Sequence, residues 1–334
     1  MNPKYIENKK LVAAYGKELS SVTTASIHTV LDKYCRADIA WNGPQPFNAI
    51  KGTSGLAEIF WKPFLAAFPY LRRDAYILFS GKDPLFEDKE WVVTAGNYVG
   101  DFQHEWLGMP PTKGAIWIRY VEFDRIEGDR ICETYTLLDI FDVMRQAGLR
   151  FNQALAPEIV TPGPWTNDGI IMCECDETES KKSYDIVRAM TFTGLTSFKD
   201  KGIGKMGLER YFSRNFMWYG PAGIGTTIGI KGFEDYHQKP FLKALPDRMP
   251  QEKEESGAMF AEGNYCGLFT WTGFTATHTG PDWLGLAPTG KRIVMRCSDL
   301  YRRDGAELVE NWVYMDLIDI LLQMGIDVFA KIRR

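Results

Sequence analysis

The chain has 334 residues, of which 45% are hydrophobic and 25% are charged, so it is long enough for two soluble globular domains. Its 39 Lys and Arg against 43 Asp and Glu give a net charge of −4, which argues against nucleic acid or an anionic membrane as a partner. The polar N-terminus MNPKYIENKK lacks the apolar core of a signal peptide, and no segment approaches the length of a membrane span. We therefore expect a cytoplasmic protein.

Helical patterns come first along the chain. Apolar residues at helical spacing over 5–19 predict one helix, and a second, short helix is expected over 24–34. A strand at 37–41 and a turn rich in glycine and proline lead to a third helix at 54–68, which Pro69 ends.

Four strand-like runs follow these helices. They are rich in Val, Ile, Thr, Tyr and Trp, with turn signals between them. The runs are 74–80, 91–102, 115–123 and 130–139. Helices followed by an antiparallel meander predict an α+β fold, in which a curved antiparallel sheet wraps around helices as a cone-shaped barrel. Pockets form in the mouths of such sheets.

The same order of elements occurs twice. The segment WLGMPPTKGAIWIR at 106–119 matches WLGLAPTGKRIVMR at 283–296 in seven of fourteen positions, at an offset of 177 residues. At the same offset, KPFLAAFP from Lys62 faces KPFLKALP from Lys239. We therefore predict two tandem domains, over 1–150 and 179–334.

The segment at 151–178 has the proline, glycine and acidic residues of a linker, and apolar residues within it, such as Ile159, Ile170 and Ile171, are expected to pack against one or both copies. The copies themselves are expected to contact each other about a pseudo-two-fold axis, as an internal pseudo-dimer. A further homodimer is left open.

The second copy carries the stronger family signature. The run GFTATHTGPDWLGLAPTGKRI at 273–293, followed by DGAELVENWVYMDLIDILLQMG at 304–325, resembles the SnoaL-like polyketide cyclase family, which has the nuclear-transport-factor-2-like fold. The resemblance covers 183–325 and, with a weaker motif, 5–148. It implies a cofactor-independent acid/base enzyme, a cyclase, isomerase or lyase, acting on a hydrophobic carbonyl-bearing small molecule such as a polyketide-like or aromatic compound.

One departure from the family pattern bears on mechanism. In the aldol-type cyclases of the family, an Asp three residues before the final-strand Asp serves as acid and base. Here those positions hold Thr136 and Val313, neither of which can transfer a proton near neutral pH. The alternatives are therefore a hydratase or hydrolase in the same cone, or a non-catalytic small-molecule binding protein.

Acidic and imidazole side chains near the ends of the last strands are the candidate catalytic groups. A carboxylate in an apolar cone has a raised pKa and can act as acid or base, and histidine moves protons near neutrality. Each also has a structural alternative, as a solvent-facing or ion-paired strand residue. The candidates are His278, Asp299 and Asp316 in the second copy and His104, Glu122 and Asp139 in the first. Because His278 and Asp299 can divide the roles of acid and base, we expect the second copy to be the better candidate for catalysis, with activity in one or both cones left open.

Aromatic residues supply candidate substrate contacts, although core packing is the favoured explanation for most of the tryptophans. The candidates are Trp41, Trp106, Trp218, Trp283, Trp312 and Tyr314. No cofactor and no metal are expected, because the six cysteines lack metal-ligand spacing. The glycines of the GxGxxG run, Gly202, Gly204 and Gly207, do not follow a buried strand, which argues against a dinucleotide site.

Overall fold

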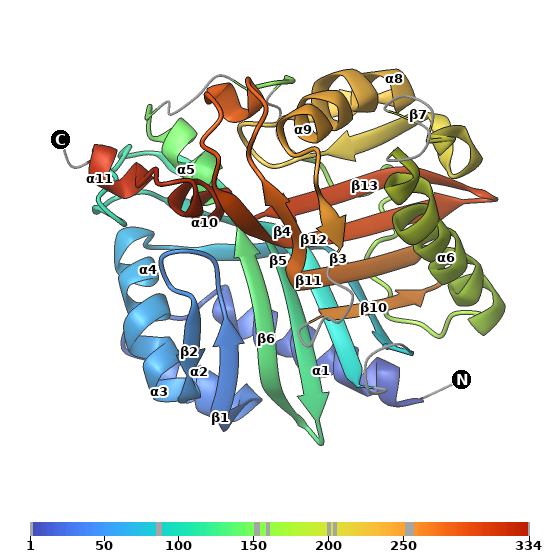
Figure 1. Ribbon diagram of the computed structural model, residues 1–334. Helices are drawn as coiled ribbons and strands as arrows, with labels where there is room; N and C mark the ends of the chain where they lie inside the picture. The colour runs from blue at the N-terminus through green and yellow to red at the C-terminus, as the bar shows by residue number, and fades with distance from the viewer. Residues whose placement is uncertain are drawn as a thin grey trace.

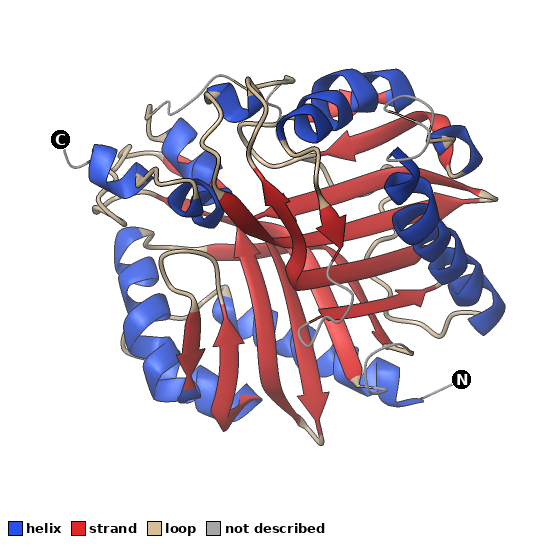
Figure 2. Ribbon diagram, in the orientation of Figure 1, coloured by secondary structure: helices blue, strands red, loops and turns tan. Residues whose placement is uncertain are grey.

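The computed structural model describes residues 3–84, 89–149, 154–157, 161–198, 202, 206–250 and 257–332. Figure 1 shows two α+β units, one built from the blue-to-green half of the chain and the other from the yellow-to-red half. Each unit has its own helices beside its own sheet, as the colouring by secondary structure makes clear (Figure 2).

The first copy has the predicted order of helices and then strands. Its elements are α1 (Pro3–Leu19), α2 (Ile27–Tyr34), β1 (Cys35–Asn42), β2 (Ala49–Lys51), α3 (Gly52–Leu56), the π-helix η1 (Ala57–Trp61), α4 (Lys62–Ala67), β3 (Arg72–Lys82), β4 (Glu90–Asp101), β5 (Ala115–Glu127), β6 (Arg130–Leu138) and α5 (Ile140–Gln146). The third predicted helix is thus α3, η1 and α4 in succession, with one π turn in its middle.

The second copy repeats this plan. Its elements are α6 (Glu177–Ala189), the π-helix η2 (Met190–Gly194), the 3₁₀ helices η3 (Leu195–Ser197) and η4 (Leu208–Arg210), β7 (Phe212–Tyr219), β8 (Thr226–Ile228), α8 (Gly229–Phe233), the π-helix η5 (Glu234–Gln238), α9 (Lys239–Ala244), β9 (Met249–Pro250), β10 (Gly257–Glu262), β11 (Tyr265–Thr277), the 3₁₀ helix η6 (Trp283–Gly285), β12 (Arg292–Asp304), β13 (Glu307–Met315), α10 (Leu317–Gln323) and α11 (Val328–Ile332). The π turn recurs at the same place, since η5 stands 177 positions after η1.

The two sheets have the same topology. Their strand orders are β2-β1-β6-β5-β4-β3 and β10-β11-β12-β13-β7-β8, with β9 pairing β11. The expected antiparallel meander is present, but β1 is parallel to β6 and β7 is parallel to β13, so an entirely antiparallel sheet was the wrong expectation. Hairpins dictate antiparallel neighbours within the meander, whereas β1 joins the sheet through helices, a connection that allows a parallel pair.

The faces of the sheets that carry no helices pack against each other. Phe123 and Tyr135 of the first copy contact Phe269 of the second, with ring centroids 4.8 and 4.4 Å apart. Phe79 and Phe260 also meet across this interface, at 5.6 Å. These buried rings join the copies through one apolar core, in addition to the core inside each cone.

Two hydrogen bonds relate the copies reciprocally. Asp139 Oδ2 accepts from the backbone N–H of Ala222 at 2.9 Å, and Asp316 Oδ2 accepts from the backbone N–H of Gln45 at 2.9 Å. Asp316 is the repeat equivalent of Asp139, and Ala222 is that of Gln45. Each copy therefore presents the same patch to the other, as an approximate two-fold relation requires.

The connecting segment packs against both copies. Ile170 forms a parallel bridge with Leu78 of β3, and Ile171 N–H donates to Leu78 O at 2.8 Å. Ala156 N–H donates to Ile224 O of the second copy at 2.9 Å. The expected packing of this segment is thus confirmed at Ile171, which is buried, whereas the Ile170 side chain is exposed although its backbone bridges to Leu78. Ile159 lies outside the described residues.

Candidate active site

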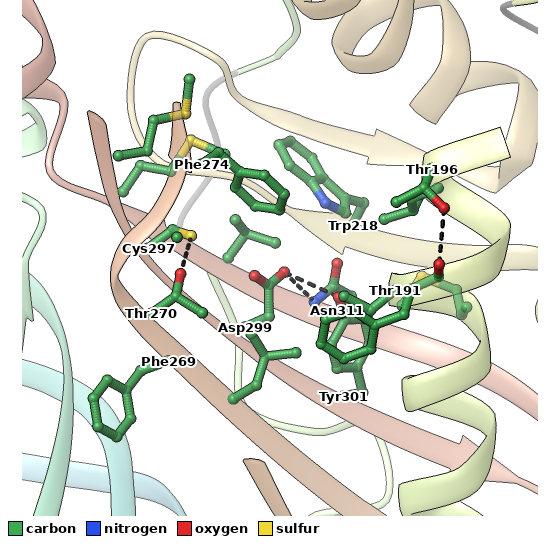
Figure 3. A pocket seen from close by; sticks show the side chains of 18 of the residues that line it. Thr191, Thr196, Trp218, Phe269, Thr270, Phe274, Cys297, Asp299, Tyr301 and Asn311 are labelled. Carbon is green, nitrogen blue, oxygen red and sulfur yellow. Dashed lines mark hydrogen bonds between the residues drawn. The ribbon is translucent and has the colours of Figure 1, made fainter. Parts of the chain in front are cut away.

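The second cone encloses a cavity of about 390 Å³. Most of its lining is apolar, from α6, η2, α8, η5, α9 and the strands β7 and β10 to β13. Figure 3 shows the Asp299 carboxylate pointing into the space between Trp218 and Phe274. A mostly apolar cavity with a few convergent polar groups has the character of a small-molecule site.

The first cone has large rings where the second has smaller side chains. Tyr120 of the first copy, fully buried, stands at the position of Cys297 in the second. Trp61, also buried, stands at the position of Gln238. Cys297 and Gln238 both line the cavity. In the second copy, these smaller side chains leave open the space that the Tyr120 and Trp61 rings fill in the first copy.

Asp299 is the acid in the cavity. Alternation along β12 turns Met295, Cys297, Asp299 and Tyr301 toward it. Asp299 Oδ1 accepts from the Tyr301 hydroxyl at 3.1 Å and from Asn311 Nδ2 at 3.3 Å. Burial raises the pKa of Asp299 to about 6, and these two hydrogen bonds, which favour the ionised form, offset only part of that effect.

His237 and its neighbours bring unpartnered polar atoms to the wall. The His237 ring stacks on Trp218 with centroids 4.2 Å apart. Burial, and to a smaller degree the positive charge of Arg248, lowers the pKa of His237 to about 3, so the ring is neutral at neutral pH. Among the described residues, His237 Nδ1, Gln238 Oε1 and Thr191 Oγ1 have no hydrogen-bond partner. A bound ligand can satisfy such atoms.

Arg248, between α9 and β9, adds a buried cation. Only 6% of the residue is exposed, and it lines the cavity. Its guanidinium carbon lies 5.0 Å from the ring centroid of Phe274 and 5.3 Å from that of Phe198. Burial lowers its pKa to about 10, which leaves the group charged at neutral pH.

Glu122, the first-copy equivalent of Asp299, has its charge balanced by an ion pair. Glu122 forms a buried ion pair with Arg73, whose Nη2 also donates to Thr94 Oγ1 at 2.6 Å. The Arg73 guanidinium lies over the Tyr120 ring, 4.7 Å from its centroid. Burial first, and then the charge of Glu122, raises the pKa of the neighbouring Asp124 to about 7. The first cone thus holds an internal ion pair among packed rings.

The other two predicted carboxylates lie at the interface between the copies. Asp139 caps α5 by accepting from Asp142 N–H at 3.0 Å, and Asp316 caps α10 by accepting from Asp319 N–H at 3.1 Å. Burial raises the pKa of both to about 6. Neither lines the large cavity, because each is turned to its own helix and to the opposite copy.

Neither predicted histidine lies in the cavity wall. His278 is buried, and its Nδ1 accepts from the backbone N–H of Thr289 at 3.3 Å, which anchors the loop before β12. Burial lowers the pKa of His278. His104 of the first copy is exposed in the loop after β4. The structure therefore does not bring His278 and Asp299 together in this cavity.

The predicted aromatic contacts divide among four places. Trp218 lines the cavity, whereas Trp41 stacks on Phe60 inside the first cone at 4.8 Å. Trp106 and Trp283 are buried in equivalent loops. Trp312 and Tyr314 lie at the interface, where Trp312 Nε1 donates to Pro162 O at 3.0 Å and Tyr314 lies 4.1 Å below the Arg119 guanidinium.

His237 and Arg248 were not singled out from the sequence, although a signal was present. At the offset of 177, His237 faces Phe60 and Arg248 faces Leu71, both buried apolar residues of the first copy. Each is a polar residue at a position that holds a buried apolar residue in the other copy. This difference between the copies is the signal in the sequence that points to His237 and Arg248.

Among the described residues, no group of three or more His, Cys, Asp and Glu side chains is placed to hold a metal ion. No helix in that part of the chain is both long enough and apolar enough to cross a membrane. The six cysteines form no disulfide.

A family model described as SnoaL-like polyketide cyclase matches the chain twice, over residues 23–147 and 206–324. Similar solved structures include a protein of Jannaschia sp. CCS1 described as a SnoaL-like polyketide cyclase, with 16% identity, a TM-score of 0.38 and coverage of 45% of this chain and 97% of that one. IdmH of Streptomyces antibioticus has 18% identity and a TM-score of 0.35 over 42% and 96% of the two chains. A protein of Acidithiobacillus ferrooxidans described as a polyketide cyclase has 21% identity and a TM-score of 0.35 over 44% and 99%. No curated protein matches.

Proposed function

The chain belongs to the SnoaL-like polyketide cyclase family, and we propose that its second copy is a cofactor-independent acid/base enzyme. The substrate is a hydrophobic, carbonyl-bearing small molecule held in the 390 Å³ cavity. Asp299 carries the proton in the reaction, and Trp218 and Phe274 form apolar walls around the substrate.

The step that this site supports is proton abstraction next to a carbonyl group. The ionised Asp299 takes a proton from the carbon, the electrons of the C–H bond form the C=C bond of an enolate, and the negative charge moves to the carbonyl oxygen. Where a C=C bond is conjugated with the enolate, return of the proton from Asp299 to the far end of the conjugated system completes an isomerisation. Attack of the enolate carbon on a second carbonyl forms the C–C bond of a ring instead, and the alkoxide that results takes the proton from Asp299. Acid/base assistance of this kind contributes about 10²- to 10⁴-fold in rate.

The position of Asp299 in the sheet supports this role. The family resemblance puts the acid/base Asp of aldol-type cyclases at the position of Val313. Asp299 on β12 pairs directly with Val313 on β13, and both residues line the cavity. Cross-strand neighbours have Cβ atoms about 4.5–5.5 Å apart. A carboxylate on β12 can therefore reach the space that a carboxylate on β13 would occupy.

One observation carries the proposal: Asp299 is a desolvated carboxylate with no ion-pair partner among the described residues, and it borders an apolar cavity. A base with a pKa near 6 is largely ionised at neutral pH and is stronger than an exposed aspartate. Its equivalent Glu122 is held by Arg73 and has packed rings around it. The second copy is thus the better candidate for catalysis.

The test is exchange of carbon-bound hydrogen in deuterium oxide. 2-Tetralone, an aromatic ketone with exchangeable hydrogens beside its carbonyl, is incubated with the protein and followed by proton NMR. We expect exchange above the buffer rate, and we expect Asp299→Asn to slow the enzymatic part by about 10² or more.

Saturable binding of 2-tetralone without enzymatic exchange would contradict the proposal and favour a non-catalytic binding protein. Full exchange by Asp299→Asn would remove this residue from the mechanism. Glu122→Gln is the matched variant at the equivalent position, and among variants that stay folded it should affect exchange less.

A further inference from the structure

The buried guanidinium of Arg248 has no counter-charge among the described residues. Its one hydrogen bond there runs from Nη2 to the backbone oxygen of Leu195 at 3.3 Å. A guanidinium has five N–H donors, so four remain without an acceptor in that part of the chain. Buried charges in proteins are normally paired or bound to a ligand.

The rings around Arg248 do not replace a counter-ion. Phe198, Phe241 and Phe274 lie 5.0–5.4 Å from the guanidinium carbon. Cation–π contacts stabilise the charge, but the phenylalanine rings carry no oxygen that could accept hydrogen bonds from the guanidinium N–H groups. The rings also exclude water, which strengthens the attraction between this cation and any anion that enters the cavity.

We propose that Arg248 binds the anionic group, a carboxylate in the first instance, of a hydrophobic ligand in the second cone. The planar guanidinium fork matches a carboxylate in a bidentate arrangement, and it is more weakly hydrated than an ammonium group. Together with the proposed function, on which its catalytic meaning rests, this defines the preferred substrate class as a hydrophobic keto acid, which should bind more tightly than a neutral ketone such as 2-tetralone.

Arg248 and Asp299 border the same cavity from different elements. Arg248 contacts Phe274, which pairs with Met295, four residues before Asp299 on β12. One ligand in this cavity can therefore meet the guanidinium with its anionic group and Asp299 with another part of its skeleton.

The experiment uses two fluorescent probes with the same ring system. 8-Anilinonaphthalene-1-sulfonate is an anion, and N-phenyl-1-naphthylamine is its neutral counterpart. We expect Arg248→Met to weaken binding of the sulfonate about ten- to a hundredfold and to leave the neutral probe within about threefold, since hydrogen bonds to charged groups have about that effect. Equal loss of both probes, or no loss of either, would overturn the proposal.

Arg188 offers a matched control, because it also lines the cavity but is exposed. Arg188→Met removes the same charge from the mouth of the site, and we expect less than a threefold change in sulfonate binding. An effect as large as that of Arg248→Met would mean general electrostatic attraction and would refute specific pairing.

The wild-type protein gives a test that does not depend on a variant folding. 2-Naphthoate and 2-naphthamide are of similar size and differ in charge, and each competes with N-phenyl-1-naphthylamine. We expect the acid to compete at least tenfold better than the amide. Equal competition would refute the proposal.

Two more variants separate the remaining explanations. Three acidic residues close to Arg248 in sequence lie outside the described residues: Glu252, Glu254 and Glu255. Replacing all three by Gln should change the affinity for the sulfonate less than threefold. A tenfold gain in affinity would show that Arg248 already has an internal acidic partner and would overturn the proposal. Asp299→Asn should keep the preference for 2-naphthoate. If the wild type binds the anion but does not exchange carbon-bound hydrogen, the proposed function is refuted and this inference stands. If it exchanges hydrogen but does not prefer the acid over the amide, this inference is refuted and the proposed function stands.

Discussion

The duplication supplies a matched pair of carboxylates whose neutralisation should have opposite effects on stability. Asp299 is desolvated without an ion-pair partner among the described residues, whereas Glu122 is paired with the buried Arg73. We predict that Asp299→Asn stabilises the protein at pH 8 and that Glu122→Gln destabilises it. Both changes replace a carboxylate by an amide of nearly the same size.

The magnitude for Asp299 follows from its pKa. An ordinary value of 3.8 raised to about 6 means that the folded state binds the proton more tightly than the unfolded state does. Stability is therefore lost as the pH rises from 3.8 to 6, and the loss is complete above that window. At about 1.36 kcal/mol for each pKa unit, the cost is at most about 3 kcal/mol at pH 8, because Asp299 is only half-buried, and about 0.5 kcal/mol or less at pH 4. An asparagine, which is neutral throughout, avoids this cost.

For Glu122, loss of the charge should lower the free energy of unfolding instead of raising it. Its side chain is 5% exposed and that of Arg73 is 2% exposed, so removing the negative charge leaves a buried cation without its partner. Breaking a buried ion pair from one side costs about 3–5 kcal/mol. Glu122→Gln should lower the free energy of unfolding by an amount of this order at neutral pH.

Urea unfolding, followed by circular dichroism at pH 8 and pH 4, measures both effects. The free energy gained by Asp299→Asn should be large at pH 8 and should nearly vanish at pH 4, where the wild-type Asp299 is itself neutral. A variant that is no more stable than the wild type at pH 8 would refute the claim that this carboxylate is desolvated. Stabilisation by Glu122→Gln would refute the contrast between the two copies.

Three further predictions concern the cavity and the interface. The exchange rate should rise with pH to a plateau with a midpoint near 6, because only ionised Asp299 accepts a proton. Tyr301→Phe, which removes a donor to that ion, should raise the midpoint by about one unit, and a wild-type midpoint near 4 would contradict this assignment. Cys297→Tyr, which introduces the ring found at Tyr120, should abolish binding of N-phenyl-1-naphthylamine without loss of far-ultraviolet dichroism; retained binding would place the probe elsewhere. Asp316→Ala should lower the free energy of unfolding by about 1–2 kcal/mol through the lost helix cap and should change exchange little, whereas a hundredfold slower exchange would make this residue catalytic after all.

Most of the fold could be predicted because it depends on local patterns. Apolar spacing located the three helical segments, and β-branched and aromatic runs located β3 to β6. The repeat then extended the same prediction to the second copy. The parallel pairing of β1 with β6 could not be predicted, because it depends on how a distant strand docks and leaves no local signal.

The site was only partly predictable. The sequence offered Asp299 as a candidate, but strand alternation defines two faces and does not say which one helices cover. Packing decides this: Asp299 faces the cavity, while Trp312 and Tyr314 face the opposite copy. His278 lies in the strongest motif, yet its ring is turned to the Thr289 loop.

The two copies divide between them requirements that conflict in a single cone. A cavity and a desolvated acid both destabilise a fold, since the cavity forfeits packing contacts and the acid loses its hydration. In the first copy, packed rings fill the space that corresponds to the cavity, and the acid equivalent to Asp299, Glu122, is paired with Arg73 beneath Tyr120. The apolar interface couples the copies, so a well-packed first cone can stabilise a second cone that carries Asp299 in an open cavity. The positions where the copies differ, rather than those they share, therefore locate the site.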